Sequence, residues 1–125
     1  GGGRFVDLFN SLPLKKQEYM NRLFRNCTEK VKYYMSVIDV EADQTFIKAR
    51  EECKYIYIIL SGKVTGVEWP MHEKSYFLFG EIECFAGLPR YRISILSSTK
   101  CRLLAIPSIY YMEWMRMDVD FYVNG

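Results

Sequence analysis

A glycine and a glutamate stand side by side at Gly80-Glu81, followed by Ile82, directly after an apolar stretch that ends at Phe79. Glycine lets the backbone approach an anion closely, and a helix that begins here points unpaired N–H groups toward that anion. The neighbouring carboxylate can accept hydrogen bonds from sugar hydroxyls. Gly80–Ile82 is therefore a candidate site for a phosphorylated or sugar-containing ligand. A plain strand-to-helix turn with an exposed glutamate is the alternative.

Two arginines, Arg90 and Arg92, follow about ten residues later, just after Pro89. The guanidinium group is a planar fork that binds phosphate or carboxylate through two parallel hydrogen bonds. We therefore expect one of these arginines to contact an anion bound at Gly80–Ile82. Two exposed arginines on a loop are the alternative interpretation.

The candidate residues lie within a series of short apolar segments that favour β-strands. Turn residues separate these segments, as at Ser61-Gly62, and Pro70 ends one of them because proline donates no ladder hydrogen bond. Many short strands with such spacing are typical of a β-barrel or sandwich. The predicted strands are Val37–Val40, Thr45–Ile47, Tyr55–Leu60, Lys63–Trp69, Tyr76–Phe79, Ile93–Leu96 and Arg102–Ile106.

Helices are expected on both sides of the strand series. Pro13 and the apolar spacing after it predict a helix to Phe24, and Thr28 is placed to cap a second helix that ends near residue 35. Pro107-Ser108 opens a C-terminal helix that runs to about residue 119. We interpret Gly1–Gly3 as a cloning remnant and residues 4–125 as a single domain.

The order of these segments resembles the effector-binding domain of the Crp/Fnr family of bacterial transcription regulators, also called the cyclic nucleotide-binding domain. The resemblance covers roughly residues 37–117. It implies a mainly β fold with flanking helices, an antiparallel β-roll (double-stranded β-helix or jelly roll), in which the glycine–glutamate segment binds phosphate and sugar. It rests on Tyr55–Val64, on Phe79–Ile82, on Pro89-Arg90 and on Cys101–Ile106.

The resemblance also implies an arginine that is followed by a small residue and that closes on the cyclic phosphate. Counting forward from Gly80 places this arginine at Arg90, whereas counting back from Cys101 places the position at Tyr91. In either alignment, Tyr91 or Arg92 puts bulk where a small residue is expected. This departure argues against cyclic AMP and leaves another nucleotide, a small organic acid, an anion of another shape or no ligand open. No cofactor is assigned.

Catalysis and metal binding are disfavoured by the residues present. His72 is the only histidine, whereas a metal-dependent barrel enzyme needs two or three. The four cysteines lie far apart, without a Cys-x-x-Cys pair, and no nucleophile–base pair can be assembled. The sequence therefore predicts a protein that is not an enzyme and has no metal site.

Charge and hydropathy set expectations for partners. A formal net charge of +2 with no recognition helix predicts no direct nucleic-acid binding by this chain. With no apolar run of eighteen residues and no leader pattern, we expect a cytoplasmic location and no membrane partner. The resemblance implies a full-length homodimer that pairs through a longer helix and reads DNA through a helix-turn-helix, and a fragment that is weakly dimeric or monomeric.

Two functions fit these observations. The first is a ligand-sensing regulatory domain of a Crp/Fnr-like transcription regulator. Its small-molecule effector is unknown, and a small anion is one possibility. The second is a β-roll whose pocket is vestigial and which acts as a protein-interaction or dimerisation module. The first predicts a basic pocket near Gly80, and the second predicts that Tyr91 or Arg92 fills it.

Overall fold

A computed structural model of the chain describes residues 2–68 and 78–124, with side chains described for residues 6–68 and 78–117. The chain forms two compact units. One contains Gly1–Met35 and Ile109–Gly125, and the other contains Ser36–Ser108. Within the described residues, no helix is both long enough and apolar enough to cross a bilayer.

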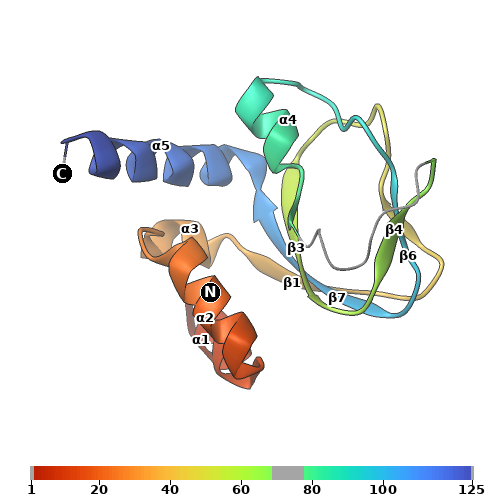
Figure 1. The fold of residues 1–125 in the computed structure, drawn as a ribbon, viewed down its shortest axis with the longest axis horizontal. Coiled ribbons are helices and arrows are strands. Elements are labelled where there is room, and N and C mark those ends of the chain that lie inside the picture. The colour runs from red at the N-terminus through yellow and green to blue at the C-terminus, as the bar shows by residue number, and fades with distance from the viewer. Residues whose placement is uncertain (1, 69–77, 125) are drawn as a thin grey trace. The chain divides into compact units, whose positions relative to one another are not determined.

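The Ser36–Ser108 unit is a roll of two antiparallel sheets with one short helix, α4, at one end (Figure 1). The four-stranded sheet has the order β1-β7-β3-β5, and the three-stranded sheet has the order β2-β6-β4. The elements are β1 (Ser36–Val40), β2 (Thr45–Ile47), β3 (Tyr55–Ser61), β4 (Val64–Gly66), β5 (Leu78–Phe79), α4 (Glu81–Ala86), β6 (Ile95–Ser97) and β7 (Cys101–Pro107).

Strands β3 and β7 form the centre of the larger sheet and of its core. Ile56 pairs with Ile106 and Ile58 pairs with Leu104, and all four side chains are at most 1% exposed. Full burial of one such side chain contributes roughly 1.5–3 kcal/mol relative to exposure. The isoleucine-rich sequence of β3 thus specifies a central strand, which holds the neighbouring β5 and the turn into α4 in place.

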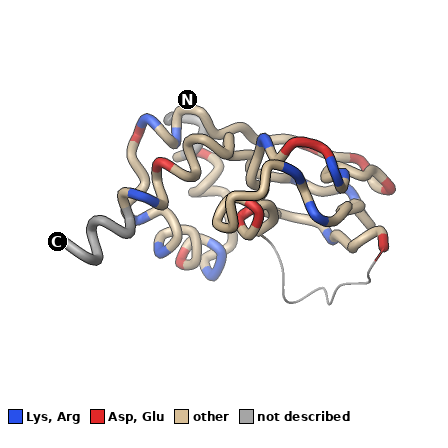
Figure 2. Tube along the Cα trace, turned by 90° about the horizontal axis from the view of Figure 1, so that it is seen from above, with Lys and Arg blue, Asp and Glu red and all other residues tan. Residues whose placement is uncertain are grey.

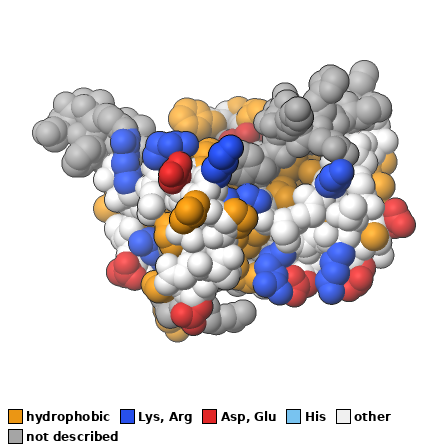
Figure 3. Space-filling view, turned by 60° about the horizontal axis from the view of Figure 1, so that its bottom comes forward, with side chains coloured by type: hydrophobic (Ala, Val, Ile, Leu, Met, Phe, Trp, Pro, Cys, Tyr) orange, Lys and Arg blue, Asp and Glu red, His pale blue; other side chains and the backbone are white. Residues whose placement is uncertain are grey.

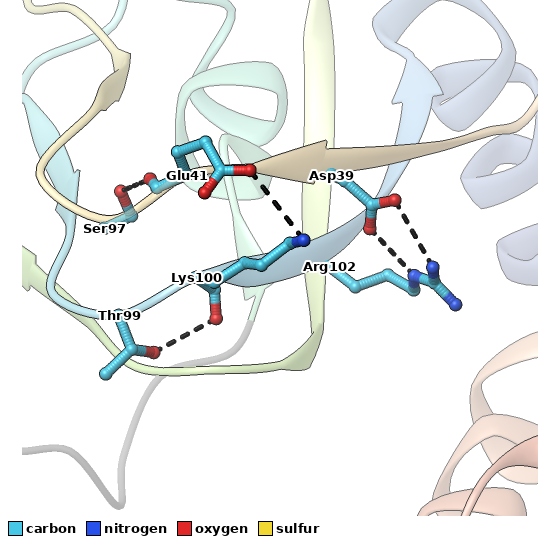
Figure 4. A network of polar contacts seen from close by, with 6 residues as sticks. All are labelled: Asp39, Glu41, Ser97, Thr99, Lys100 and Arg102. Carbon is cyan, nitrogen blue, oxygen red and sulfur yellow. Dashed lines mark hydrogen bonds and ion pairs between the residues drawn. The ribbon is translucent and has the colours of Figure 1, made fainter.

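A buried serine ties the turn between β1 and β2 to the end of β6 (Figure 4). The Ser97 hydroxyl donates to the Glu41 carbonyl oxygen at 2.6 Å and accepts the Gln44 N–H at 2.9 Å. On the exposed side of the same region, the Arg102 guanidinium pairs with the Asp39 carboxylate at 2.8 Å. This hydrogen bond lowers the pKa of Asp39.

The other unit consists of α1 (Gly2–Ser11), α2 (Leu14–Phe24), α3 (Glu29–Tyr33) and α5 (Ser108–Asn124), of which Ser108 belongs to the roll. Thr28 caps α3 by accepting the Val31 N–H at 3.3 Å. Phe24 stacks on Trp114 with ring centroids 4.9 Å apart, and Trp114 is only 1% exposed. An aromatic contact therefore joins α2 to α5 inside this unit.

Charged residues are interspersed over both units rather than gathered by sign. Figure 2 shows basic and acidic positions on many segments of the chain, and the face drawn in Figure 3 places lysines and arginines beside acids. This distribution accords with the small formal net charge of +2.

The predicted β-roll with flanking helices is confirmed, and some details differ. The strand expected at Ile93–Leu96 begins only at Ile95, the described part of the Lys63–Trp69 strand is limited to Val64–Gly66, and α5 extends to Asn124. The sequence analysis missed α1, which includes Gly2 and Gly3. Trp69, His72 and the Tyr76 end of the next predicted strand lie outside the described residues.

Candidate ligand site

Gly80 makes the turn between β5 and α4, and its position requires glycine. Its φ is +94°, and an added Cβ would lie 3.0 Å from both the Tyr55 carbonyl oxygen and the Ile56 Cδ1 atom. The Gly80 carbonyl oxygen accepts the Cys84 N–H at 3.1 Å, which closes the first turn of α4. The predicted change from strand to helix at Gly80-Glu81 is therefore present, although α4 has only six residues.

The short helix α4 is inverted relative to an ordinary amphipathic helix. Ile82 and Phe85 are 51% and 74% exposed, whereas Glu83 is only 4% exposed. A buried carboxylate needs partners because its desolvation is costly. Glu83 finds them in Arg92: its Oε2 accepts the Arg92 backbone N–H at 3.1 Å, and its Oε1 lies 4.0 Å from the Arg92 Nε.

Glu81 has no comparable partner. Its Oε2 atom is buried and accepts no hydrogen bond from the described residues. Burial raises the pKa of the Glu81 carboxyl. A hydrogen bond from its own backbone N–H lowers this pKa, the charge of nearby Glu83 raises it, and the charge of Arg92 lowers it. Burial is the largest of these effects, so the protonated form of Glu81 is favoured more than in water.

The two predicted arginines have different surroundings. The Arg90 guanidinium donates to the Arg50 carbonyl oxygen at 2.8 Å, in the loop between β2 and β3. Arg92 lies beside Glu83 on α4, as described above, with about half of its side chain exposed. The structure therefore brings Arg92, rather than Arg90, to the helix that begins after Gly80.

Tyr91, between these arginines, is part of the core. It is 7% exposed, and its hydroxyl makes two hydrogen bonds to the backbone of Tyr55. The hydroxyl donates to the Tyr55 carbonyl oxygen at 2.6 Å, and the hydroxyl oxygen accepts the Tyr55 N–H at 3.2 Å. Burial raises the pKa of the Tyr91 phenol, so it stays neutral. The buried Tyr91 side chain therefore lies at the start of β3, where its hydroxyl contacts the Tyr55 backbone.

Sequence reasoning missed Glu83 and Cys53 as neighbours of the site. Cys53 is buried, its thiol lies 3.8 Å from the Gly80 carbonyl oxygen, and burial raises its pKa to about 12. A glutamate flanked by Ile82 and Cys84 gives no hint of its own burial, because charged residues are rarely buried unless paired. The only signal in the sequence was the pair of acids at Glu81 and Glu83 before the arginines.

The cluster on α4 sets limits on what can bind. Two carboxyls, Glu81 and Glu83, face one guanidinium, that of Arg92, so the cluster is formally acidic unless Glu81 is protonated. With Glu81 neutral, Glu83 and Arg92 balance each other. Among the described residues, no group of three or more His, Cys, Asp or Glu side chains is placed to hold a metal ion.

The sequence matches no known protein family and no curated protein. Solved structures give a clear answer on the fold. The chain is similar to the sensor domain of the transcriptional regulator DNR from Pseudomonas aeruginosa, with a TM-score of 0.68 at 14% identity, over 80% of this chain and 74% of that one.

Two further solved structures support the same fold. The c-di-GMP responsive global regulator CLP of Xanthomonas campestris matches at a TM-score of 0.55 and 11% identity, over 70% of this chain and 46% of that one. The regulatory domain of Toxoplasma gondii PKA, solved with cAMP, matches at 0.55 and 20% identity, over 83% of this chain and 38% of that one. The fold is that of a cyclic nucleotide-binding domain.

The length of the matched proteins is also informative. This chain spans about half of DNR (51%) and of a protein from Ruegeria pomeroyi (48%). DNR and CLP are both described as regulators, and in DNR the matching part is the sensor domain. The likeness of this chain is therefore to regulatory, cyclic nucleotide-binding-like domains.

Proposed function

We propose that this chain is the effector-sensing domain of a cytoplasmic, Crp/Fnr-like transcription regulator and that it does not respond to cyclic AMP. The observation that carries the proposal is the arrangement at α4. In a fold of the cyclic nucleotide-binding type, Gly80 opens α4 as the resemblance requires, but a buried tyrosine, Tyr91, stands among the residues that should clamp a cyclic phosphate.

One feature supports the exclusion of cyclic AMP. The Tyr91 hydroxyl is already bonded to the backbone of Tyr55, so moving it aside breaks two hydrogen bonds. An effector without a cyclic phosphate, such as a small carboxylate, does not require Tyr91 to move. Repulsion from the carboxyls of Glu81 and Glu83 opposes any anion at α4 and so does not distinguish the two.

The effector site proposed here is the backbone of Gly80–Ile82 together with an arginine side chain. Arg92 is the stronger candidate because it contacts Glu83 of α4, whereas the Arg90 guanidinium donates to the Arg50 carbonyl oxygen. An anion would compete with Glu83 for Arg92, and protonation of Glu81 would reduce the repulsion. DNA recognition and tight dimerisation are assigned to the longer regulator, and no catalytic role is proposed.

Calorimetry with cyclic AMP tests this proposal directly. We expect no micromolar binding by the native chain. The double variant Tyr91→Arg/Arg92→Ser restores an arginine followed by a small residue, and we expect it to gain affinity for cyclic AMP if it folds, as judged by circular dichroism. Micromolar binding of cyclic AMP by the native chain would overturn the exclusion.

A thermal-shift screen over nucleotides and carboxylic acids then tests for another effector. A ligand at one hundred times its dissociation constant raises the free energy of unfolding by about 2.7 kcal/mol. For an anionic hit, Arg92→Ala should weaken binding by roughly 1.5–3 kcal/mol, the range for a charge-assisted hydrogen bond. Arg90→Ala is the matched control and should change affinity little. Equal affinity of both variants and the native chain would place the site elsewhere.

A second function, the protein-interaction module, is favoured by two observations. The first is the burial of Tyr91, which this function predicts. The second is an exposed apolar surface. The exposed face of α4 and the loop that follows it present Ile82, Phe85 and Leu88, which are 51%, 74% and 40% exposed. Apolar side chains gathered on one short helix are typical of a contact surface. If the screen finds no ligand and Phe85→Glu abolishes dimerisation in analytical ultracentrifugation, this second function replaces the first.

A further inference from the structure

Two of the four cysteines meet at the turn that opens α4. Cys53 lies in the loop before β3, and Cys84 lies on α4. Both approach one atom, the Gly80 carbonyl oxygen, which lies 3.8 Å from the Cys53 Sγ and accepts the Cys84 N–H at 3.1 Å. The two thiol groups are also close enough to interact with each other. The fold thus brings together two thiols that are far apart in the sequence.

The backbone on both sides of this contact is hydrogen-bonded. The Cys53 N–H donates to the Pro89 carbonyl oxygen at 2.9 Å, in the loop that follows α4. The Cys84 carbonyl oxygen accepts the Gly87 N–H at 3.2 Å, in the last turn of the helix. The Cys53 loop is therefore tied to the loop after α4 as well as to the turn before it. The two thiols are neighbours because the folded backbone holds them there.

The two thiols differ in their surroundings. Cys53 is buried, whereas Cys84 is partly exposed, so Cys84 is the thiol that a dissolved oxidant reaches first. Burial raises the pKa of Cys53 to about 12. Burial also raises the pKa of Cys84, the hydrogen bond with Cys53 lowers it, and the acids Glu83 and Glu81 raise it. The contact between the thiols therefore favours the thiolate of Cys84, which makes Cys84 the attacking sulfur.

We propose that Cys53 and Cys84 are a modification site, at which a low-molecular-weight disulfide oxidises the two thiols to an intramolecular disulfide. The Cys84 thiolate attacks one sulfur of the oxidant, whose S–S bond breaks and releases one thiol after protonation. The Cys53 thiol then loses its proton and attacks the Cys84 sulfur, so the mixed disulfide breaks and releases the second thiol. The two cysteines give up two electrons in total, and the oxidant is reduced to two thiols.

The new bond would join α4 to the loop before β3, beside the turn at Gly80. Because burial leaves few thiolates at neutral pH, we expect the reaction to be slow and its yield to be set by the proximity of the two sulfurs. This distinguishes the pair from a fast sensor, which uses a thiol of low pKa. The modification goes beyond the proposed function and does not depend on an effector.

Glutathione disulfide is the probe for this site, and it is used on the whole native chain. The chain is incubated in buffers of reduced and oxidised glutathione, quenched with acid and examined by mass spectrometry, intact and as peptides. We expect it to lose the mass of two hydrogen atoms, with the bond mapped to Cys53 and Cys84. Because the neighbouring thiol acts at a high effective concentration, this form should exceed the glutathione adduct of Cys84 by roughly tenfold or more. Excess reduced glutathione should restore both thiols.

Three results on the native chain would overturn the proposal. The first is a glutathione adduct as the main product, and the second is a bond that involves Cys27 or Cys101. The third is two free thiols at Cys53 and Cys84 after prolonged incubation with glutathione disulfide alone. These results need no variant, so the test stands even if a substitution at the buried Cys53 prevents folding.

Variants assign the order of attack. In Cys53→Ala, folded as judged by circular dichroism, we expect Cys84 to accumulate the glutathione adduct because the second thiol is missing. In Cys84→Ala we expect neither a disulfide nor an adduct at the buried Cys53. A folded Cys53→Ala without the adduct, or a folded Cys84→Ala in which Cys53 reacts as fast as in the native chain, would contradict the assigned roles.

The other two cysteines provide matched controls. Cys27 belongs to the helical unit, and the Cys101 Sγ contacts the Lys63 and Thr99 carbonyl oxygens at 3.3 and 3.2 Å. Cys27→Ala and Cys101→Ala should form the bond between Cys53 and Cys84 as the native chain does. Its loss in either folded control would overturn the pairing. The cyclic AMP and effector tests bear only on ligand binding, so their failure leaves this proposal unaffected.

Discussion

The two ends of the roll treat buried polar side chains in opposite ways. At the turn between β1 and β2, the fully buried Ser97 hydroxyl both donates and accepts hydrogen bonds. At α4, Glu81 has a buried oxygen that is without a partner among the described residues. Buried polar groups are nearly always paired in folded proteins, and the exceptions concentrate at functional sites. The comparison therefore supports the proposal that an effector site lies at α4 rather than at the Ser97 turn.

The same contrast is visible in the apolar residues. Around Ser97, the neighbouring Ile95 is buried, whereas Ile82 and Phe85 on α4 are exposed. Burying Glu83 while exposing Ile82 costs free energy that the rest of the fold must offset. A segment that keeps such an arrangement is not optimised for stability alone. Variants at the two ends can test whether stability and binding are separated in this way.

The largest expected effect is at the Ser97 turn. Ser97→Ala leaves the Gln44 N–H and the Glu41 carbonyl oxygen without their partner, and each unsatisfied group costs about 1–3 kcal/mol. We expect the free energy of unfolding in urea to fall by about 3 kcal/mol. The neighbouring exposed Ser98→Ala is the control and should change it by less than about 0.5 kcal/mol.

If Ser97 contributes only to stability, the same variant should leave binding at α4 unchanged. Any effector affinity found at α4 should be unchanged in Ser97→Ala under conditions in which the variant is folded. A loss of affinity in the folded variant would show that the two ends are not separate.

The next effect concerns the two ends of α4. Gly80 and Gly87 both have positive φ, +94° and +71°, but an added Cβ at Gly80 meets Tyr55 and Ile56, whereas at Gly87 it meets nothing within 4 Å. We expect Gly80→Ala to lower the free energy of unfolding by about 2 kcal/mol and Gly87→Ala by about 1 kcal/mol, the cost of the backbone conformation. Equal losses in chemical denaturation would mean that close packing at Gly80 is unimportant.

Removal of the Tyr91 hydroxyl should have a moderate effect. Tyr91→Phe keeps the ring in the core but leaves the Tyr55 backbone without its two hydrogen bonds to the phenol. We expect thermal and urea unfolding to show a loss of about 1.5 kcal/mol. The exposed Tyr33→Phe is the control. An unchanged stability in Tyr91→Phe would indicate that the two hydrogen bonds between the hydroxyl and the Tyr55 backbone contribute little to stability.

Much of the fold could be predicted from local sequence patterns. The apolar run Tyr55–Leu60 indicated a strand, and Thr28 and Pro107-Ser108 indicated helix starts. The helix α1 was missed because its first residues are glycines, which disfavour helices. The strand expected from Ile93 begins only at Ile95. The apolar side chain of Ile93 gives no indication of where the hydrogen-bonded pairing with a neighbouring strand starts.

The site was less predictable because it depends on pairing across the chain. The turn at Gly80 follows from local sequence, since only glycine fits its backbone. The burial of Glu83 depends on Arg92, nine residues away, and hydrophobicity alone would have placed Ile82 inside instead. Which of Arg90 and Arg92 contacts α4 depends on the path of the loop after this helix, which residue types do not specify.

The smallest expected effect is the pH dependence at Glu81. Because burial raises the pKa of this carboxyl in the folded state, the folded protein holds the proton more tightly than the unfolded chain does. Stability therefore falls as pH rises from the ordinary glutamate pKa through the raised value, since the folded state must then bury a charge. Glu81→Gln removes this dependence. We expect its melting temperature to match that of the native protein near pH 4 and to be higher at pH 7, by an amount that grows across this window.

The exposed Glu18→Gln is the control, for which a surface substitution should change stability by less than about 0.5 kcal/mol. A melting temperature of Glu81→Gln that lies below the native value at pH 7 would mean that the charged carboxylate has a partner and that the contrast with Ser97 does not hold.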